Sequence, residues 1–299
     1  MNIPSACFDP IKSKNHKKYT PEYCFEPEMQ PLARAIYVGD TKEIKRLQKE
    51  LSTDINYMSS KSGFRYLYYA CLMEDIEVVK TLLSLGADPN KVIMDISKGK
   101  PPAKTTNIYF AVARGNIKLA KILLENGANP NTMVGLLPLN VAMSHKNMQE
   151  YFDLLFKYGA DANFKEYGSC DNAAQIALSG SHYEFILYFL DKGSDPKSVN
   201  RYGNSLAYSV QLKLENFRGS DDQRKILQDV KNRLENEYGI KFPVKQNRKE
   251  GIENEISIYE RLPQEIKELP GMEESKKYFR KLKDSLEKGK TLMGQSIIN

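Results

Sequence analysis

The chain has 299 residues, of which 41% are hydrophobic, and its 44 lysines and arginines outnumber 38 aspartates and glutamates to give a net charge of +6. This apolar content suffices for a continuous core, and the small basic excess is spread along the chain, which disfavours a nucleic-acid-binding stripe. No run of about 18 apolar residues occurs, so the sequence predicts no transmembrane helix.

Residues 1–27 form an arm before the first repeated unit, and they contain Cys7 and Cys24. Three interpretations remain open for these cysteines. A disulfide would close a loop of about 16 residues and stabilise the fold by about 3 kcal/mol in an oxidising compartment. Alternatively, the small residues before Cys7 are similar to the cleavage site of a bacterial lipoprotein, where the cysteine takes a lipid. In the third interpretation both thiols are free.

Five similar segments are expected to form the first helix of a repeated helix pair. Each has an alanine at its fifth position, which allows two helices to approach closely. The segments are 31–40, 66–75, 107–116, 138–147 and 173–182, and their alanines are Ala35, Ala70, Ala111, Ala142 and Ala177. A small residue repeated at the same place in all five segments predicts stacked helices.

A glycine-led turn follows the second helix of four units, at Gly86, Gly127, Gly159 and Gly193, with spacings of 41, 32 and 34 residues. Glycine closes a helix in the left-handed conformation, and the Asp, Asn or Pro that follows turns the chain. A period near 33 with this punctuation resembles the ankyrin repeat. The resemblance implies an all-α repeat fold, a solenoid of about six helix pairs with short hairpin fingers.

The first spacing of the series, 41 residues, is longer than the others because about eight extra residues fall within 91–104, between two units. An ankyrin-like stack would place this insertion at a finger tip. Lys98 and Lys100 make it basic, and Pro101 and Pro102 stiffen it. Long loops within compact repeats are often functional. The insertion is therefore either an extended finger that contacts a partner or a tolerated surface loop.

The ankyrin resemblance also implies which first-helix residues face the groove. Tyrosine, leucine, methionine and phenylalanine gather there in the first three units, and an exposed apolar patch of this kind usually marks an interaction site. The alternative is that the arm folds back over the patch. The expected partner-binding residues are Arg34, Tyr37, Val38, Tyr69, Leu72, Met73, Phe110, Arg114 and His145, together with Lys98 and Lys100.

A sixth unit starts near Asn200, and its second helix, 221–237, has one apolar face and one charged face. A terminal repeat needs such a polar face, so the solenoid is expected to span 28–243. The extension 244–299 should contain a helix at 273–288 with Phe279, Leu282 and Leu286 on one face. Its basic surface suits packing onto the solenoid or, alternatively, contact with a membrane or an acidic partner.

The sequence lacks the common catalytic and metal-binding motifs. The three histidines lie in separate segments, and no zinc-type Cys/His spacing, phosphate-binding glycine loop or nucleophile elbow occurs. The sequence therefore predicts a protein-binding module rather than an enzyme, with no metal and no cofactor.

Three features together suggest a narrower resemblance: the arm motifs at 7–10 and 23–27, the opening unit at 32–40, and the atypical end at 200–243. They resemble bacterial ankyrin-repeat lipoproteins that are immunity partners of type VI secretion phospholipase effectors. The resemblance implies a periplasmic protein, membrane-anchored through a lipid at Cys7, that binds and occludes a lipase toxin as one half of a heterodimer. The second interpretation is a secreted bacterial ankyrin effector, cytoplasmic or delivered into a host cell, that acts as an adaptor on host proteins.

Overall fold

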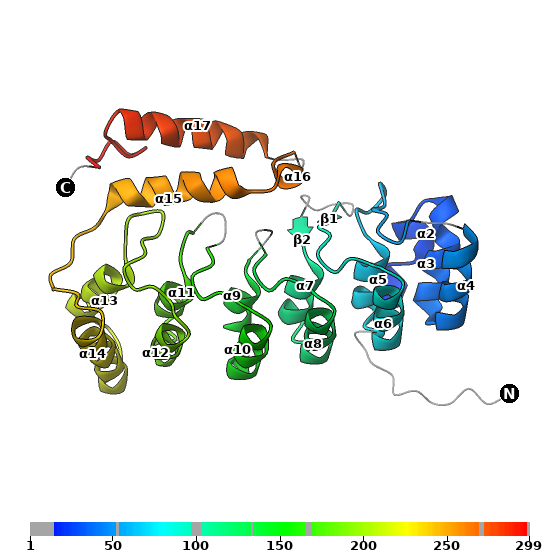
Figure 1. The fold of residues 1–299 in the computed structure, drawn as a ribbon, viewed down its shortest axis with the longest axis horizontal. Coiled ribbons are helices and arrows are strands. Elements are labelled where there is room, and N and C mark those ends of the chain that lie inside the picture. The colour runs from blue at the N-terminus through cyan, green and yellow to red at the C-terminus, as the bar shows by residue number, and fades with distance from the viewer. Residues whose placement is uncertain are drawn as a thin grey trace. The chain divides into compact units, whose positions relative to one another are not determined.

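The computed structural model describes residues 15–51, 54–96, 103–132, 134, 136–165, 169–268 and 272–297 (Figure 1). The chain divides into two compact units. Unit 1 comprises residues 1–138 and 149–159, and unit 2 comprises residues 139–148 and 160–299. Each unit is described by itself below.

Unit 1 is built mainly from helix pairs. The helices of each pair pack on one another, α3 on α4, α5 on α6 and α7 on α8, and α5 packs between α3 and α7. Its elements are α2 (Pro21–Cys24), the 3-10 turn η1 (Pro27–Met29), α3 (Gln30–Val38), α4 (Thr41–Leu51), α5 (Tyr66–Met73), α6 (Ile76–Ser84), β1 (Ile93–Asp95), β2 (Ala103–Thr105), α7 (Asn107–Ala113), α8 (Ile117–Glu125) and most of α10 (Met148–Lys157).

Local sequence explains where these helices begin and pack. The side chains of Asp75, Thr106 and Asn116 accept backbone N–H groups at the starts of α6, α7 and α8, which satisfies donors that the helix itself leaves unpaired. Ala70 and Ala111 are fully buried, as the predicted close approach of helices requires. The helix-pair prediction is confirmed for the first three units.

Asn56 and Asn90 each join one repeat to the next, a role that the sequence did not reveal. The Asn90 amide donates to the carbonyl of Gly127 at 2.9 Å, and its oxygen accepts the N–H of Asn129 at 2.7 Å. Asn56 makes the equivalent pair of bonds one repeat earlier: its amide donates to the Gly86 carbonyl, and its oxygen accepts the N–H of Asp88. These side-chain hydrogen bonds connect consecutive turns of unit 1.

The insertion at 91–104 begins and ends as a β-hairpin. β1 and β2 are antiparallel, with Ile93 opposite Thr105 and Asp95 opposite Ala103. β1 also contacts the preceding finger, because the N–H of Met94 donates to the Gly63 carbonyl at 3.2 Å. Lys98 and Lys100 lie outside the described residues. The described part of the insertion is therefore an extended finger rather than an irregular loop.

Unit 2 continues the helix pairs and adds a helical extension. α11 packs on α12, α13 packs on α14, and α15 packs on α17. Its elements are α9 (Pro138–Ala142, with Pro138 in unit 1), α11 (Ala173–Ser179), α12 (Glu184–Asp191), α13 (Leu206–Glu215), α14 (Asp221–Asn236), α15 (Arg248–Arg261), α16 (Gln264–Lys267) and α17 (Glu273–Glu287).

Helix α14 has the properties predicted for a terminal cap. A capping box joins Ser220 and Gln223 at its start, and Leu227, Val230 and Leu234 are fully buried along one face. Charged residues occupy the opposite face, where no further repeat pair follows. The predicted second helix of the sixth unit is confirmed.

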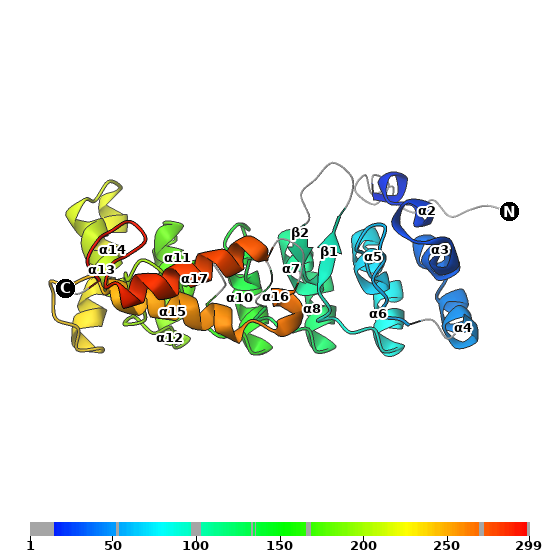
Figure 2. The same cartoon turned by 90° about the horizontal axis from the view of Figure 1, so that it is seen from above.

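The extension packs onto the last finger of its own unit. α15 and α17 lie side by side in both views (Figures 1 and 2) and enclose a core of Ile252, Ile256, Phe279, Leu282 and Ile297. The N–H of Asn247 donates to the Gly203 carbonyl at 2.8 Å, and the Asn254 amide donates to the Val199 carbonyl at 3.1 Å. The predicted helix near 273–288 is confirmed, as is its packing within the protein. None of the described helices combines the length and apolar character needed to cross a membrane.

Candidate protein-binding surface

The described part of the arm, residues 15–27, covers the apolar groove residues of the first two repeats. The Tyr69 hydroxyl donates to the Tyr19 carbonyl at 2.7 Å, and the Asn15 amide donates to the Leu72 carbonyl at 2.8 Å. Tyr69, Leu72 and Met73 are each at most 6% exposed. The prediction that these three side chains face solvent was therefore wrong, and the alternative in which the arm folds back is confirmed. Burial of their apolar area within the chain stabilises the fold.

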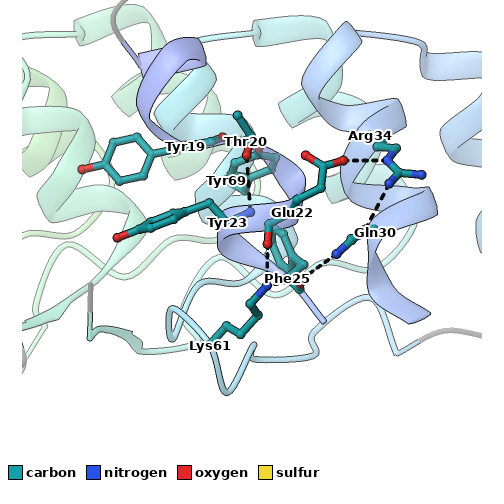
Figure 3. A network of polar contacts seen from close by, with 9 residues as sticks. All are labelled: Tyr19, Thr20, Glu22, Tyr23, Phe25, Gln30, Arg34, Lys61 and Tyr69. Carbon is teal, nitrogen blue, oxygen red and sulfur yellow. Dashed lines mark hydrogen bonds and ion pairs between the residues drawn. The ribbon is translucent and has the colours of Figure 1, made fainter. Parts of the chain in front are cut away.

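Aromatic rings hold the arm in place (Figure 3). Phe25 meets Tyr69 edge to face with ring centroids 5.2 Å apart. It also stacks on Tyr66 at 5.1 Å. Tyr19 packs against Phe64 at 5.7 Å. Such aromatic pairs each contribute about 0.5–1.5 kcal/mol beyond the area that they bury. Tyr19 and Phe25 of the arm are thus integral to the packing of unit 1.

Cys24 belongs to this core. It is fully buried with a free thiol, and its carbonyl accepts hydrogen bonds from the hydroxyls of Ser59 and Ser62 at 2.7 and 2.8 Å. Burial raises the pKa of the Cys24 thiol to about 12. The structure thus gives Cys24 a packing role and shows no disulfide there. Cys7 lies outside the described residues.

A polar surface with two exposed apolar side chains lies outside the covered groove. The Arg34 guanidinium pairs with Glu22 at 2.9 Å and donates to the Gln30 side chain at 3.1 Å (Figure 3). Tyr23 follows Glu22 and is 40% exposed, while Val38 stands one turn beyond Arg34 and is 72% exposed. We name Glu22, Tyr23, Arg34 and Val38 the arm face.

The remaining predicted site residues are less accessible or stand elsewhere. The Tyr37 hydroxyl donates to the His16 carbonyl at 3.0 Å, so the arm half-buries it. Phe110 is half-buried against Tyr68 with their rings 5.1 Å apart. Arg114 pairs with Glu74 at 3.5 Å. His145 is half-buried in unit 2.

Glu26 anchors the arm to the second finger through an ionised carboxylate. Its Oε1 accepts the Ser60 N–H at 2.7 Å and the Ser60 hydroxyl at 2.5 Å. Burial on its own would raise the pKa of Glu26, but these bonds and those of neighbouring groups favour the charged form. The net result is a pKa lowered to about 2.

This carboxylate should make the stability of unit 1 depend on pH. Because the pKa of Glu26 is depressed in the folded state, its stabilisation is complete above the unfolded value of about 4.3 and is lost as the pH falls toward 2. Glu26→Gln should remove about 2 kcal/mol near neutral pH and flatten the dependence of unfolding free energy on pH between 5 and 2. Denaturant unfolding across that range measures both effects.

Ser60→Ala provides the matched control for this prediction. It removes one of the two bonds from Ser60 but leaves the carboxylate, so it should reduce the same pH dependence only in part. Equal pH profiles for the parent protein and Glu26→Gln would contradict the assignment.

A second polar cluster, which sequence reasoning missed, joins the extension to the last finger of unit 2. Arg201 on the finger pairs with Glu255 on α15 at 3.1 Å, and the Tyr278 hydroxyl on α17 donates to Glu255 at 3.2 Å. Burial raises the pKa of Glu255 in spite of the nearby guanidinium. A cavity of about 240 Å³ opens beside this cluster. No group of three or more metal-ligating side chains occurs in the described part of the chain.

Comparisons with known proteins agree with this architecture. A model of the ankyrin repeat family matches residues 63–93 and 105–133, which include α5 to α8. Comparison with curated protein sequences gave no significant match. Among solved structures, the ankyrin repeat domain of Bcl-3, a member of the IkappaB protein family, is 18% identical with a TM-score of 0.50, covering 66% of this chain and 97% of that one.

The human ASB11 ankyrin repeat domain is also 18% identical, with a TM-score of 0.48, and the match covers 72% of this chain and 86% of that one. Identities at this level concern the fold alone. Ankyrin stacks typically serve as non-catalytic scaffolds that present extended surfaces to other proteins. The chain therefore contains ankyrin repeats, has the predicted all-α repeat fold, and carries a module for protein–protein interaction.

Proposed function

We propose that the protein works by binding another protein, and that the arm face of unit 1 is the contact surface. The observation that carries this proposal is that two exposed apolar side chains adjoin the members of the Glu22–Arg34 ion pair along the chain: Tyr23, 40% exposed, follows Glu22, and Val38, 72% exposed, lies one helical turn after Arg34. Exposed aromatic and apolar side chains beside an arginine have the composition of interface hot spots. Because the arm covers the groove, a partner would meet the arm first.

For the partner, we propose a secreted lipase or phospholipase of a type VI secretion system, which this protein would neutralise by occlusion in the periplasm, with a lipid at Cys7 as a membrane anchor. The support is the resemblance of the arm motifs, the opening unit and the atypical last repeat to ankyrin-type immunity lipoproteins. The adaptor function in a host cell is the competing outcome of the experiment below.

Val38→Asp combined with Tyr23→Ala should weaken binding to such a partner by about 100-fold or more, because a charge at an apolar contact and the loss of an aromatic anchor together cost several kcal/mol. Calorimetry with a purified phospholipase effector of a type VI secretion system measures the affinity. Co-expression with the effector directed to the periplasm measures neutralisation, which the double variant should lose.

Leu51→Asp is the matched control. Leu51 is an exposed apolar residue of unit 1, 47% exposed, but it belongs to α4 and not to the arm face. It should bind and neutralise like the parent protein. Equal affinities for the parent and the arm-face variant would exclude the arm face. Absence of binding to type VI secretion phospholipase effectors, with stable binding to a host protein instead, would replace immunity with the adaptor function.

A further inference from the structure

The cavity of unit 2 has an apolar interior and a basic rim. Its lining includes Ile252, Leu282, Leu292 and Met293, with Arg201 and Arg248 among the polar residues. Leu292 is 46% exposed and Met293 is 89% exposed, which is unusual for large apolar side chains beside a packed core. The finger, both long helices of the extension and the turn after α17 all contribute to this wall.

Of the two arginines that line the cavity, Arg201 pairs with a carboxylate and Arg248 does not, among the described residues. Glu255 is 3% exposed, and its two oxygens are already engaged by Arg201 and by the Tyr278 hydroxyl. Arg248, by contrast, forms no ion pair with a carboxylate among the described residues, and its Nη1 donates to the Ser296 carbonyl at a long 3.5 Å. One guanidinium therefore remains available at the rim, and the lining carries a net positive charge.

The volume restricts what the cavity can hold. Pockets for drug-sized ligands and cofactors occupy about 300–1,000 Å³, whereas a buried cavity of about 150 Å³ accepts one benzene ring. A cavity of about 240 Å³ lies between these limits. It is large enough for one aromatic side chain.

We propose that this cavity is an anchor pocket for an acidic peptide segment of a protein partner, which inserts one aromatic side chain and places a carboxylate on Arg248. The inference rests on the proposed protein-binding function and adds a second contact site, in unit 2. The apolar walls supply the affinity for the ring. The Arg248 guanidinium, which pairs with no carboxylate among the described residues, selects a neighbouring carboxylate over a neutral or basic group, because charge-assisted hydrogen bonds are the stronger ones.

A blocked pentapeptide, Glu-Asp-Phe-Asp-Glu, is the probe for this pocket, titrated into the full chain labelled with ¹³C at its methionine methyl groups. We expect a saturable shift of the Met293 signal, assigned with Met293→Leu, with a dissociation constant on the order of 1 mM. Replacing the phenylalanine with alanine, or the four acidic residues with lysine, should weaken the response by about tenfold or more.

Arg248→Gln should weaken binding of the parent peptide by about tenfold, through loss of a charge-assisted bond. Arg261→Gln is the matched control, because Arg261 is an exposed arginine of the same helix that does not line the cavity. It should leave the affinity within about twofold, since a distant surface charge is screened. Equal weakening by both substitutions would indicate non-specific attraction and overturn the proposal.

Other outcomes are equally decisive. A silent Met293 signal at about 5 mM peptide would overturn the anchor pocket, since binding that weak has no role at an interface. A response to phosphatidylglycerol vesicles without a response to the peptide would replace the peptide with a membrane surface. If partner binding still depends on Val38 while the pocket is silent, only the pocket fails. If the peptide binds while arm-face variants change nothing, only the arm face fails.

Discussion

Tyr69→Ala is expected to lower the free energy of unfolding of unit 1 by about 3–5 kcal/mol, the range measured for deleting a fully buried aromatic side chain. Tyr69 is completely buried, packs edge to face on Phe25, and holds the Tyr19 carbonyl through its hydroxyl. Its removal opens a cavity under the arm. Urea unfolding followed by circular dichroism measures the loss, and faster tryptic cleavage at Lys17 or Lys18 reports release of the arm.

Two controls separate packing from the hydrogen bond. Tyr69→Phe keeps the ring and should cost only about 1 kcal/mol, the usual net value of one hydrogen bond. Tyr202→Ala removes a tyrosine that is 63% exposed, so it should change stability by no more than about 0.5 kcal/mol. A Tyr69→Ala protein as stable as the parent, with an equally protected arm, would refute the covered groove.

The covering of this groove shows what a repeat pattern leaves undetermined. The period, the alanines and the glycine turns predicted the helix pairs because each repeat contacts its neighbours in the same way. The arm is not part of the repeat, so no spacing in the sequence says where it docks. One signal was nevertheless available: the sequence of α5, Tyr66–Met73, contains only apolar and aromatic residues, and a helix that is apolar on every side is usually buried on every side. The structure buries all eight of its residues.

The extension shows the same division between local and distant information. The apolar stripe of α17 was recognised from its spacing, because that pattern depends on one helix alone. The contacts that seat the extension, by contrast, join Arg201 to Glu255 and Tyr278 across long stretches of sequence. Arg201 precedes an exposed tyrosine in a finger, and nothing adjacent to it indicates a buried carboxylate partner. The cavity at this junction therefore could not be predicted from the sequence.

Gly251→Ala is expected to lower the stability of unit 2, although alanine in place of glycine inside a helix normally gains about 1 kcal/mol. A Cβ atom at Gly251 would lie 2.5 Å from the Gly203 nitrogen and 2.8 Å from the Asn200 carbonyl oxygen. Both are backbone atoms of the finger, so neither can rotate away. Either the contact opens or the backbone shifts, and overpacking of this kind costs about 1–3 kcal/mol, which outweighs the helix-propensity gain.

The predicted loss of stability is opposite in sign to the gain that helix propensity alone would give. The substitution therefore tests whether the extension packs against the finger. Gly251→Ala should also raise amide hydrogen exchange in α15 and α17, because both helices depend on the same docking contact. Ser257→Ala, at an exposed position of α15, should instead leave exchange unchanged and stabilise slightly through helix propensity. If Gly251→Ala stabilised the protein as Ser257→Ala does, helix propensity alone would govern the site, and the extension could not be held against the finger at this glycine.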